Sequence, residues 1–476
     1  MAARDARFDG RFFTGVTSTG IYCRPICPAR TPARRNVRFY AHAAAAESAG
    51  FRACRRCRPE AGPGTPQWDF RGDLVGRALR LIADGVADEG GVVALARRLA
   101  VTERHLHRLF VAELGVGPQA VARTRRLQLA RRLLRESALP VTDVAFASGF
   151  GSVRQFNAAF REAYGMAPGE LRGKGVAPRT GAPLELRLAY RPPYDVSAML
   201  GFLTARAMPG LEEVGEARYA RVLRSRAGPA VVELTFDPLH SAVHMRLTGP
   251  DVRGTAALVA ACRRLLDLDA DPQAIAAALG GAPALGPLLR DRPGLRLPGT
   301  VDGFELAVRA VLGQQVSVAA ARTLGGRLVA RLGEPLSTPV GTLTHAFPGP
   351  EAIAADELDG LGLTGARRRT LRGLAEAVAD GRVRLDGAAE PAEVSAALTA
   401  LAGIGPWTAS YVALRALRDP DAFPIDDLGL KKAMERLGVA RGDVERWRPW
   451  RAYAAQHLWT LPPEPVGAGV PLKETA

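Results

Sequence analysis

Four of the five cysteines lie near the N-terminus, in two close pairs that a loop separates. Cys23 and Cys27 form the first pair, and Cys54 and Cys57 form the second. Two such pairs are the usual ligand pattern of a tetrahedral zinc site with four thiolates. Two disulfides are the alternative, which a reducing cytosol disfavours. The spacing therefore predicts bound Zn2+, and a segment as short as residues 1–60 is expected to depend on the metal for its folding.

A pair of carboxylates near the C-terminus is the second group that could do chemistry. Asp426 and Asp427 precede the apolar helical spacing of residues 430–437. Aspartate is a preferred N-cap, so capping is the simpler interpretation of the pair. A cap also holds its carboxylate in place, and a fixed carboxylate can stabilise the cationic transition state of glycosidic-bond cleavage. The residues by themselves leave a structural role and a catalytic role open.

A Gly-x-Gly turn at Gly403 and Gly405 precedes another apolar helical pattern. Such a turn exposes backbone N–H groups at a helix N-terminus, where they can bind a phosphate. A lone Gly-x-Gly most often marks only a turn. The nearby carboxylate pair strengthens the interpretation of this turn as part of a functional site.

The spacing between residues 73 and 172 contains a helix-turn-helix pattern twice. A turn at residues 101–102 separates two apolar helical runs in the first copy, and a turn at 149–151 does so in the second. A helix over residues 121–134 is predicted to join them. The second helix of such a unit normally enters the major groove, and an ordinary helical bundle is the alternative. The polar residues expected to face bases and phosphates are Arg104, His105, Arg108, Arg154 and Gln155.

The charge distribution favours a polyanionic partner for the N-terminal part. The chain has 64 Lys and Arg against 48 Asp and Glu, a net charge of +16 over 476 residues. Residues 1–180 hold 30 of the basic and 15 of the acidic residues, so nearly the whole excess is N-terminal. A basic segment attracts DNA because each neutralised phosphate releases condensed counterions. A basic surface that only confers solubility is the alternative.

From residue 184 onward the apolar spacing becomes alternating, which predicts half-buried strands of an antiparallel sheet. Two helices would cover one face of this sheet, and everything from residue 301 is predicted to be helical. The predicted strands are residues 184–188, 232–236 and 243–247, and the predicted covering helices are residues 196–207 and 255–268.

Gly- and Pro-rich stretches at residues 59–66 and 173–183 predict two linkers. No apolar run reaches the length of a membrane helix, and the first residues lack the apolar core of a signal peptide. A cytoplasmic protein without a membrane partner is therefore expected.

Residues 184–460 resemble the AlkA-type 3-methyladenine-DNA glycosylase II family of the helix-hairpin-helix superfamily. The hairpin at residues 401–409, followed by Pro-Ile-Asp-Asp at 424–427, carries this resemblance. The resemblance implies an α+β antiparallel-sheet domain over residues 184–298 and an all-α helix-hairpin-helix glycosylase domain over residues 299–462. Further matching segments are residues 191–195, 199–202, 292–299 and 311–318.

The resemblance to the glycosylases also implies residue roles. It places catalysis on Asp427 and leaves Asp426 as the N-cap. Trp407 occupies the position of the Schiff-base lysine of strand-nicking relatives, and an indole cannot form an imine. Hydrolysis without strand cleavage is therefore implied. Aromatic faces attract a cationic alkylated purine, and the implied base-pocket residues are Phe202, Trp407, Tyr411 and Trp459.

A further implied role concerns the gap that a base leaves when it is extruded from the duplex. Relatives fill this gap with a leucine, and Gln315 holds the corresponding position here. Glutamine can fill space and hydrogen-bond the orphaned partner base. The resemblance thus implies DNA contacts at Gln314, Gln315, Gly403 and Gly405.

Residues 1–172 resemble the N-terminal half of the Ada adaptive-response family, through residues 19–27 and 50–57 and the helix-turn-helix pair. This implies a small zinc-bound α/β domain over residues 1–60 and an all-α, AraC-type double helix-turn-helix domain over residues 73–172. It gives Cys23 a second task, the irreversible acceptance of a methyl group from a DNA phosphotriester, because metal coordination keeps a thiolate nucleophilic. A purely structural zinc site is the alternative. The arginines expected to face phosphate are Arg24, Arg30, Arg34 and Arg35.

Together these patterns predict a multidomain DNA alkylation-repair protein. A monofunctional glycosylase that releases bases such as 3-methyladenine would be joined to a methyl-sensing regulator. This protein would bind double-stranded DNA as a monomer and act on RNA polymerase at a promoter. The alternative is a DNA-binding transcriptional regulator whose C-terminal half only binds DNA and has no glycosylase activity.

Overall fold

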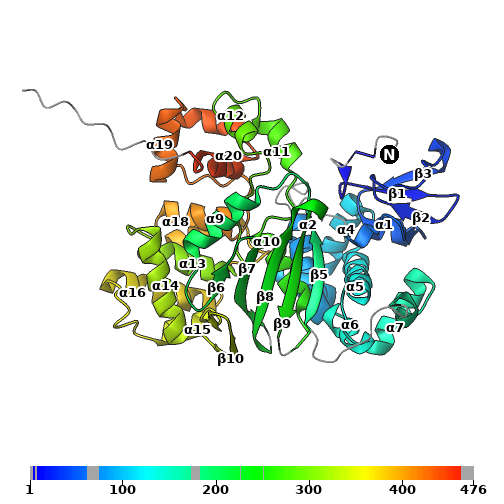
Figure 1. Cartoon of the computed structure of the whole chain (residues 1–476), viewed down its shortest axis with the longest axis horizontal. Helices are drawn as coiled ribbons and strands as arrows, with labels where there is room; N and C mark the ends of the chain where they lie inside the picture. The colour runs from blue at the N-terminus through cyan, green and yellow to red at the C-terminus, as the bar shows by residue number, and fades with distance from the viewer. Residues whose placement is uncertain are drawn as a thin grey trace, which may run out of the picture.

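The chain folds as four consecutive parts, coloured from blue to red in Figure 1. The computed structural model describes residues 4–5, 8–61, 74–172, 183–225, 227–249 and 251–461. Most of the two predicted linkers, at residues 62–66 and 173–182, lies outside the described residues. None of the helices in the described ranges combines the length and the apolar character that a bilayer crossing needs.

The first part is a small sheet packed against one helix (Figure 1). The strand order is β3-β1-β2-β4, with β2 and β4 parallel and the other pairs antiparallel. Phe13, Tyr22 and Phe51 belong to its apolar core. A core of this size is small for independent folding, which agrees with the predicted dependence on a metal. The elements are β1 (Phe13–Val16), β2 (Ile21–Cys23), β3 (Val37–Tyr40), α1 (Ala43–Ser48) and β4 (Arg52–Ala53).

The second part contains the predicted pair of helix-turn-helix units, α3–α4 and α6–α7, joined by the long helix α5. Thr102 caps α4 by accepting the backbone N–H of His105, and Ser152 caps α7 by accepting that of Gln155. Both helices end at a glycine with a left-handed backbone, Gly115 and Gly165. The helices are α2 (Leu74–Ala83), α3 (Val86–Arg98), α4 (Glu103–Leu114), α5 (Pro118–Glu136), α6 (Val141–Ala147), α7 (Val153–Tyr164) and α8 (Pro168–Arg172).

The third part is an antiparallel sheet in the order β5-β9-β8-β7-β6. The three predicted strands correspond to β5, β8 and β9, whereas β6 and β7 were not predicted. Arg221 lies in the middle of β7, is 2% exposed, and pairs with Glu305 at 2.6 Å. Because this buried arginine interrupts the apolar residues of β7, the sequence pattern does not indicate the strand. The elements are β5 (Leu184–Ala189), α9 (Val196–Arg206), β6 (Glu212–Val214), β7 (Arg218–Ser225), β8 (Gly228–Asp237), β9 (Ala242–Thr248) and α10 (Thr255–Leu265).

The fourth part is helical with one exception, so the expectation of helix throughout is wrong at that place. Strands β10 and β11 form a hairpin that contacts β7 and β8. Most β10 side chains are exposed, so no apolar period marks the strand in the sequence. The elements are α11 (Pro272–Leu279), α12 (Gly286–Asp291), α13 (Gly303–Leu312), α14 (Val318–Leu332), β10 (Pro335–Val340), β11 (Leu343–His345), α15 (Pro350–Ala355), α16 (Gly365–Ala379), α17 (Pro391–Thr399), α18 (Pro406–Arg415), α19 (Leu428–Arg436) and α20 (Arg451–Leu458).

Apolar clusters cross the boundaries between the parts. Phe156 and Phe160 of α7 belong to the same buried cluster as Leu184 and Leu188 of β5, and α5 lies along this edge strand (Figure 1). Ala388, which precedes α17, is buried in the cluster formed by the first helix-turn-helix unit. The helix-turn-helix part is therefore packed against both the sheet and the C-terminal helices.

Candidate functional site

A cavity of about 850 Å³ lies among helices α9, α13, α14, α18 and α20. It contains every residue that the sequence predicts for the base pocket. These residues come from segments more than two hundred positions apart, so only the tertiary fold brings them together. The predicted residues that line the cavity are Phe202, Trp407, Tyr411, Asp427 and Trp459.

Both carboxylate oxygens of Asp427 accept hydrogen bonds. Oδ2 accepts the indole N–H of Trp407 at 3.0 Å, and Oδ1 accepts the indole N–H of Trp459 at 2.9 Å. Oδ1 also accepts the backbone N–H of Leu430 at 3.0 Å, which makes Asp427 the N-cap of α19. Three donors therefore hold the carboxylate at the wall of the cavity.

The prediction that Asp426 is the N-cap is wrong. Its side chain is 53% exposed and pairs with Lys431 at 3.2 Å and with Arg441 at 3.3 Å. The hydrogen bond from Lys431 is the main reason that the pKa of Asp426 lies below its usual value. Asp427, and not Asp426, both caps the helix and lines the cavity.

The positions of the aromatic side chains around Asp427 follow from residue spacing on helix α18 and from the lack of a side chain at Gly429. Trp407 and Tyr411 are one turn apart on α18 and stack with centroids 5.6 Å apart and planes 14° apart. Trp459 reaches the carboxylate past Gly429, where a Cβ would lie 3.1 Å from Oδ1 of Asp427 and 3.4 Å from Cδ1 of Trp459. The sequence predicts these rings as pocket lining but misses that two indole N–H groups position the carboxylate.

The Gly-x-Gly turn is fixed by side chains packed against it. Gly403 has a φ of 85°, and a Cβ at this position would collide with Oγ1 of Thr370. Nε2 of Gln314 donates to the carbonyl of Gly403 and to Oγ1 of Thr408, each at 3.0 Å. Gln314 thus connects the turn before α14 to the hairpin through hydrogen bonds. The neighbouring Gln315 is exposed and has a φ of 55°. DNA contacts by these glutamines stay predictions.

The two glycines of the turn should respond differently to alanine. We expect Gly403→Ala to destabilise the protein by about 2 to 4 kcal/mol, because a left-handed backbone and a side-chain collision both oppose a Cβ. Gly405→Ala should cost at most about 1 kcal/mol, because alanine is a poorer N-cap than glycine but φ is −94° and a Cβ would meet nothing within 4 Å. Calorimetric unfolding of the full-length variants measures both effects. Equal losses of stability in Gly403→Ala and Gly405→Ala would contradict the packing described for the turn.

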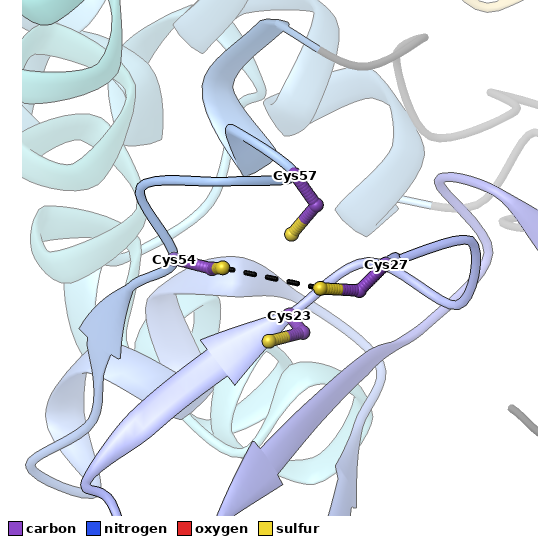
Figure 2. Close-up of side chains that lie close together, drawn as sticks. All are labelled: Cys23, Cys27, Cys54 and Cys57. Atoms are coloured by element: carbon purple, nitrogen blue, oxygen red, sulfur yellow. Dashed lines mark hydrogen bonds between the residues drawn. The ribbon is translucent and has the colours of Figure 1, made fainter. Parts of the chain in front are cut away.

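The four N-terminal cysteines converge at one point (Figure 2). Their Sγ atoms lie within 4.8 Å of one another, and all four are buried free thiols. Metal–sulfur bonds of about 2.3 Å in a tetrahedron place the sulfurs about 3.8 Å apart. The Sγ atoms of Cys27 and Cys54 are 4.0 Å apart. The arrangement therefore fits a metal ion bound by Cys23, Cys27, Cys54 and Cys57.

A second cavity, of about 580 Å³, opens beside Cys23, Cys27 and Cys54. Tyr164 at the end of α7 and the nearby Met166 form part of its wall. The sequence does not reveal this contribution, because it depends on how the second helix-turn-helix unit packs on the metal domain. A positively charged wall suits a phosphate ligand. The arginines that line the cavity are Arg30, Arg52, Arg55, Arg56 and Arg131.

The expectation that Arg24 faces phosphate is wrong. Its guanidinium pairs with the buried carboxylate of Asp9, with 2.8 Å between Nε and Oδ1, and also donates to the carbonyl of Cys57 at 3.0 Å. The backbone N–H of Arg24 lies 3.4 Å from Sγ of Cys57. Arg24 therefore holds the cysteine loops together. The exposed arginines of the predicted group are Arg30, Arg34 and Arg35.

The residues predicted to read DNA lie near the N-terminal ends of α4 and α7. His105 is half-buried, and its Nδ1 lies 3.0 Å from Nη2 of Arg108. Their position at the starts of the second helices is the one that helix-turn-helix proteins turn toward a groove. Their individual DNA contacts stay predictions. The exposed members of this set are Arg104, Arg108, Arg154 and Gln155.

Four family models match successive segments of the chain. The metal binding domain of Ada matches residues 1–60, and a helix-turn-helix domain matches residues 95–174. The AlkA N-terminal domain matches residues 185–302, and the HhH-GPD superfamily of base excision DNA repair proteins matches residues 308–449. These segments follow the order of the four parts of the fold, although α11 and α12 of the fourth part lie within the match to the AlkA N-terminal domain.

The chain is also similar to whole proteins. A probable bifunctional transcriptional activator/DNA repair enzyme AlkA of Mycobacterium tuberculosis is 47% identical, over 100% of this chain and 98% of that protein. DNA-3-methyladenine glycosylase 2 of Escherichia coli is 39% identical over 57% of this chain and 95% of that protein. The bifunctional transcriptional activator/DNA repair enzyme Ada of Escherichia coli is 37% identical over 37% of this chain and 48% of that protein. The chain therefore belongs to the family of bifunctional transcriptional activator and DNA repair proteins of the AlkA type.

Proposed function

We propose that the protein repairs alkylated DNA by hydrolysing the N-glycosidic bond of bases such as 3-methyladenine, with Asp427 as the catalytic carboxylate. The observation that carries this proposal is the carboxylate itself, which the indoles of Trp407 and Trp459 hold at the wall of a cavity of about 850 Å³. A cavity of this volume can admit one extruded base. The glycosylase name of the Escherichia coli relative agrees with this function.

Asp427 would act on the sugar of the extruded nucleotide. Positive charge develops on the sugar ring as the bond between the base and C1′ breaks. A carboxylate that three donors already hold needs no reorganisation to face this charge. Water then adds its hydroxyl group to C1′. When the base is cationic before cleavage, it leaves as a neutral molecule and the proton of the water is released to solvent; when the base is neutral, the departing base takes up that proton. The products are a free base and an abasic site.

The contents of the cavity favour hydrolysis alone over combined hydrolysis and strand cleavage. A lyase step needs an amine that forms an imine with C1′. No lysine is found among the described residues that line the cavity. Trp407 donates its N–H to Asp427 and provides no nucleophile. The DNA strand should therefore stay intact after the base is released.

The function is tested by incubating the full-length protein with a methylated DNA duplex. We expect free methylated base in the supernatant, measured by chromatography, and an abasic site that breaks only after alkali treatment. A protein that binds the duplex but releases no base would instead be a regulator without glycosylase activity.

We further propose that the four cysteines bind Zn2+ and that Cys23 accepts a methyl group from a DNA methylphosphotriester. A bound zinc ion would keep the thiolate deprotonated at neutral pH. In the transfer, a bond forms between Sγ of Cys23 and the methyl carbon while the carbon–oxygen bond breaks, which leaves a phosphodiester. The arginine-lined cavity beside Cys23 supports the approach of a phosphate group. The methylated protein would bind DNA more readily, as a monomer, and act on RNA polymerase at a promoter.

Peptide mass spectrometry tests the acceptor role. After exposure to DNA that carries methylphosphotriesters, we expect the mass of one methyl group on the peptide that contains Cys23. Cys54 is an internal control, because it lines the same cavity and is expected to stay unmodified. Modification of another cysteine, or of none, would leave the metal site with a structural role only.

A further inference from the structure

Arg415, the last residue of α18, is a buried cation in the wall of the base cavity. It is 3% exposed, and its guanidinium donates to the carbonyl of Pro298 and to Oε1 of Gln456, each at 2.9 Å. Its Nε is buried without a hydrogen-bond partner among the described residues. These hydrogen bonds go to neutral groups, so the positive charge is not neutralised by a directly bonded carboxylate.

The aromatic side chains of the cavity surround this guanidinium. Its central carbon lies 4.8 Å from the ring centroid of Phe202, 5.3 Å from that of Trp459 and 5.7 Å from that of Tyr411. The central carbon of Arg206, which also lines the cavity, lies 4.0 Å from the centroid of Phe202. Three of the four rings predicted to attract a cationic base are therefore already in contact with a cation.

Arg415 keeps its charge under physiological conditions. Burial lowers the pKa of Arg415 to about 10, which still leaves the group protonated at neutral pH. A ring face that already interacts with one cation attracts a second cation less strongly, and two positive charges in a cavity of low dielectric repel each other. A cationic base entering the cavity would meet this repulsion, whereas a neutral base would not.

The charge also affects the departing base. A neutral purine takes up the electron pair of the glycosidic bond and becomes anionic unless it is protonated, and a fixed cation nearby stabilises this change. A base that is cationic before cleavage leaves as a neutral molecule and gains less from the cation. Arg415 should thus lower the barrier for neutral bases relative to cationic bases.

We propose that Arg415 is a specificity-determining residue, which shifts excision from cationic alkylated bases toward neutral damaged purines. This inference rests on the proposed glycosylase function. The sequence contains a signal for it, because Trp407, Tyr411 and Arg415 follow one another at intervals of four residues and so share one face of α18.

The test compares two duplexes that differ in the charge of the damaged base. One contains 7-methylguanine, which is cationic in DNA, and the other contains hypoxanthine, which is neutral. The measured quantity is the ratio of the single-turnover release rates of the two bases. We expect Arg415→Met to raise the ratio of 7-methylguanine to hypoxanthine release by about tenfold or more.

A ratio is needed because Arg415 also has structural contacts. Partial unfolding of the variant would lower both rates by the same factor and leave their ratio unchanged. Arg415→Lys keeps the positive charge but loses the planar pair of hydrogen bonds, so it should lower both rates and keep the ratio within about threefold of the wild type.

Two outcomes would overturn the inference. One is an unchanged ratio in Arg415→Met, and the other is the same change of ratio in Arg415→Met and Arg415→Lys. A wild-type protein that releases neither base would instead disprove the glycosylase function itself, so the two failures are distinguishable.

Discussion

Asp427→Asn should lower the rate of base release by about 10² to 10³-fold while leaving duplex binding nearly unchanged. The variant removes the negative charge that would face the developing sugar cation. Asparagine is as good an N-cap as aspartate, so the start of α19 should persist. The side-chain amide can still accept from Leu430 and one indole, but its nitrogen cannot accept the second indole N–H. Single-turnover release of methylated base and fluorescence anisotropy with the same duplex measure the two effects.

Asp426→Asn is the matched control for this experiment. It makes the same chemical change one residue away, at an exposed carboxylate that pairs with Lys431 and Arg441. Exposed ion pairs contribute little to stability, so base release should stay within about twofold of the wild type. A slow Asp426→Asn variant together with a nearly normal Asp427→Asn variant would reverse the assignment of the catalytic carboxylate.

Removal of the metal should unfold the N-terminal domain. Zinc binding to four cysteines contributes about 10 to 16 kcal/mol in small domains, which is more than the small core around Phe13, Tyr22 and Phe51 could replace. A chelator should therefore abolish hydrogen-exchange protection in residues 8–61 of the full-length protein and make the four thiols reactive. The C-terminal helices have their own large apolar core, so protection there should persist. Unchanged protection of residues 8–61 would contradict the predicted dependence on the metal.

A pair of cysteine variants provides the control for metal binding. Cys54→Ala removes one of the four converging thiols and should lose the bound metal, together with protection of the N-terminal domain. Cys262→Ala removes a thiol that is also buried but lies in α10, outside the cluster. Its metal content, measured by elemental analysis, should match that of the wild type. Metal retention by Cys54→Ala would show that another set of ligands is used.

Features encoded over short stretches of chain could be predicted from the sequence. The two helix-turn-helix units follow from apolar residues repeated at helical spacing between turn signals. The convergence of the cysteines follows from ligand spacing, because one close pair begins at the end of β2 and the other follows β4. Strands β5, β8 and β9 follow from alternation, because one side of each is buried. In each case the pattern can be recognised within short, neighbouring segments of the chain.

Features that depend on distant partners could not be predicted in this way. The sequence pattern does not indicate strand β7, because Arg221 in that strand is buried against Glu305 of α13. The hairpin of β10 and β11 lies against the sheet, a contact that the sequence pattern does not show. The hydrogen bond that holds Asp427 from the other side comes from Trp459, which follows α20 and lies 32 positions away in the sequence. The burial of Arg415 depends on Pro298 and Gln456, which lie far from it in the sequence.

The sequence, together with the resemblance that its motifs carry, therefore predicted the order of the four parts, the four cysteines that converge, and five of the residues that line the cavity of about 850 Å³. The tertiary structure alone decided which carboxylate is held by two indoles, which arginine is enclosed by aromatic rings, and how the second helix-turn-helix unit closes the cavity beside the cysteines. The physical reason is that local periodicity reports which faces of an element are buried, whereas the charge and hydrogen bonding of a site depend on side chains that only folding brings within a few ångströms.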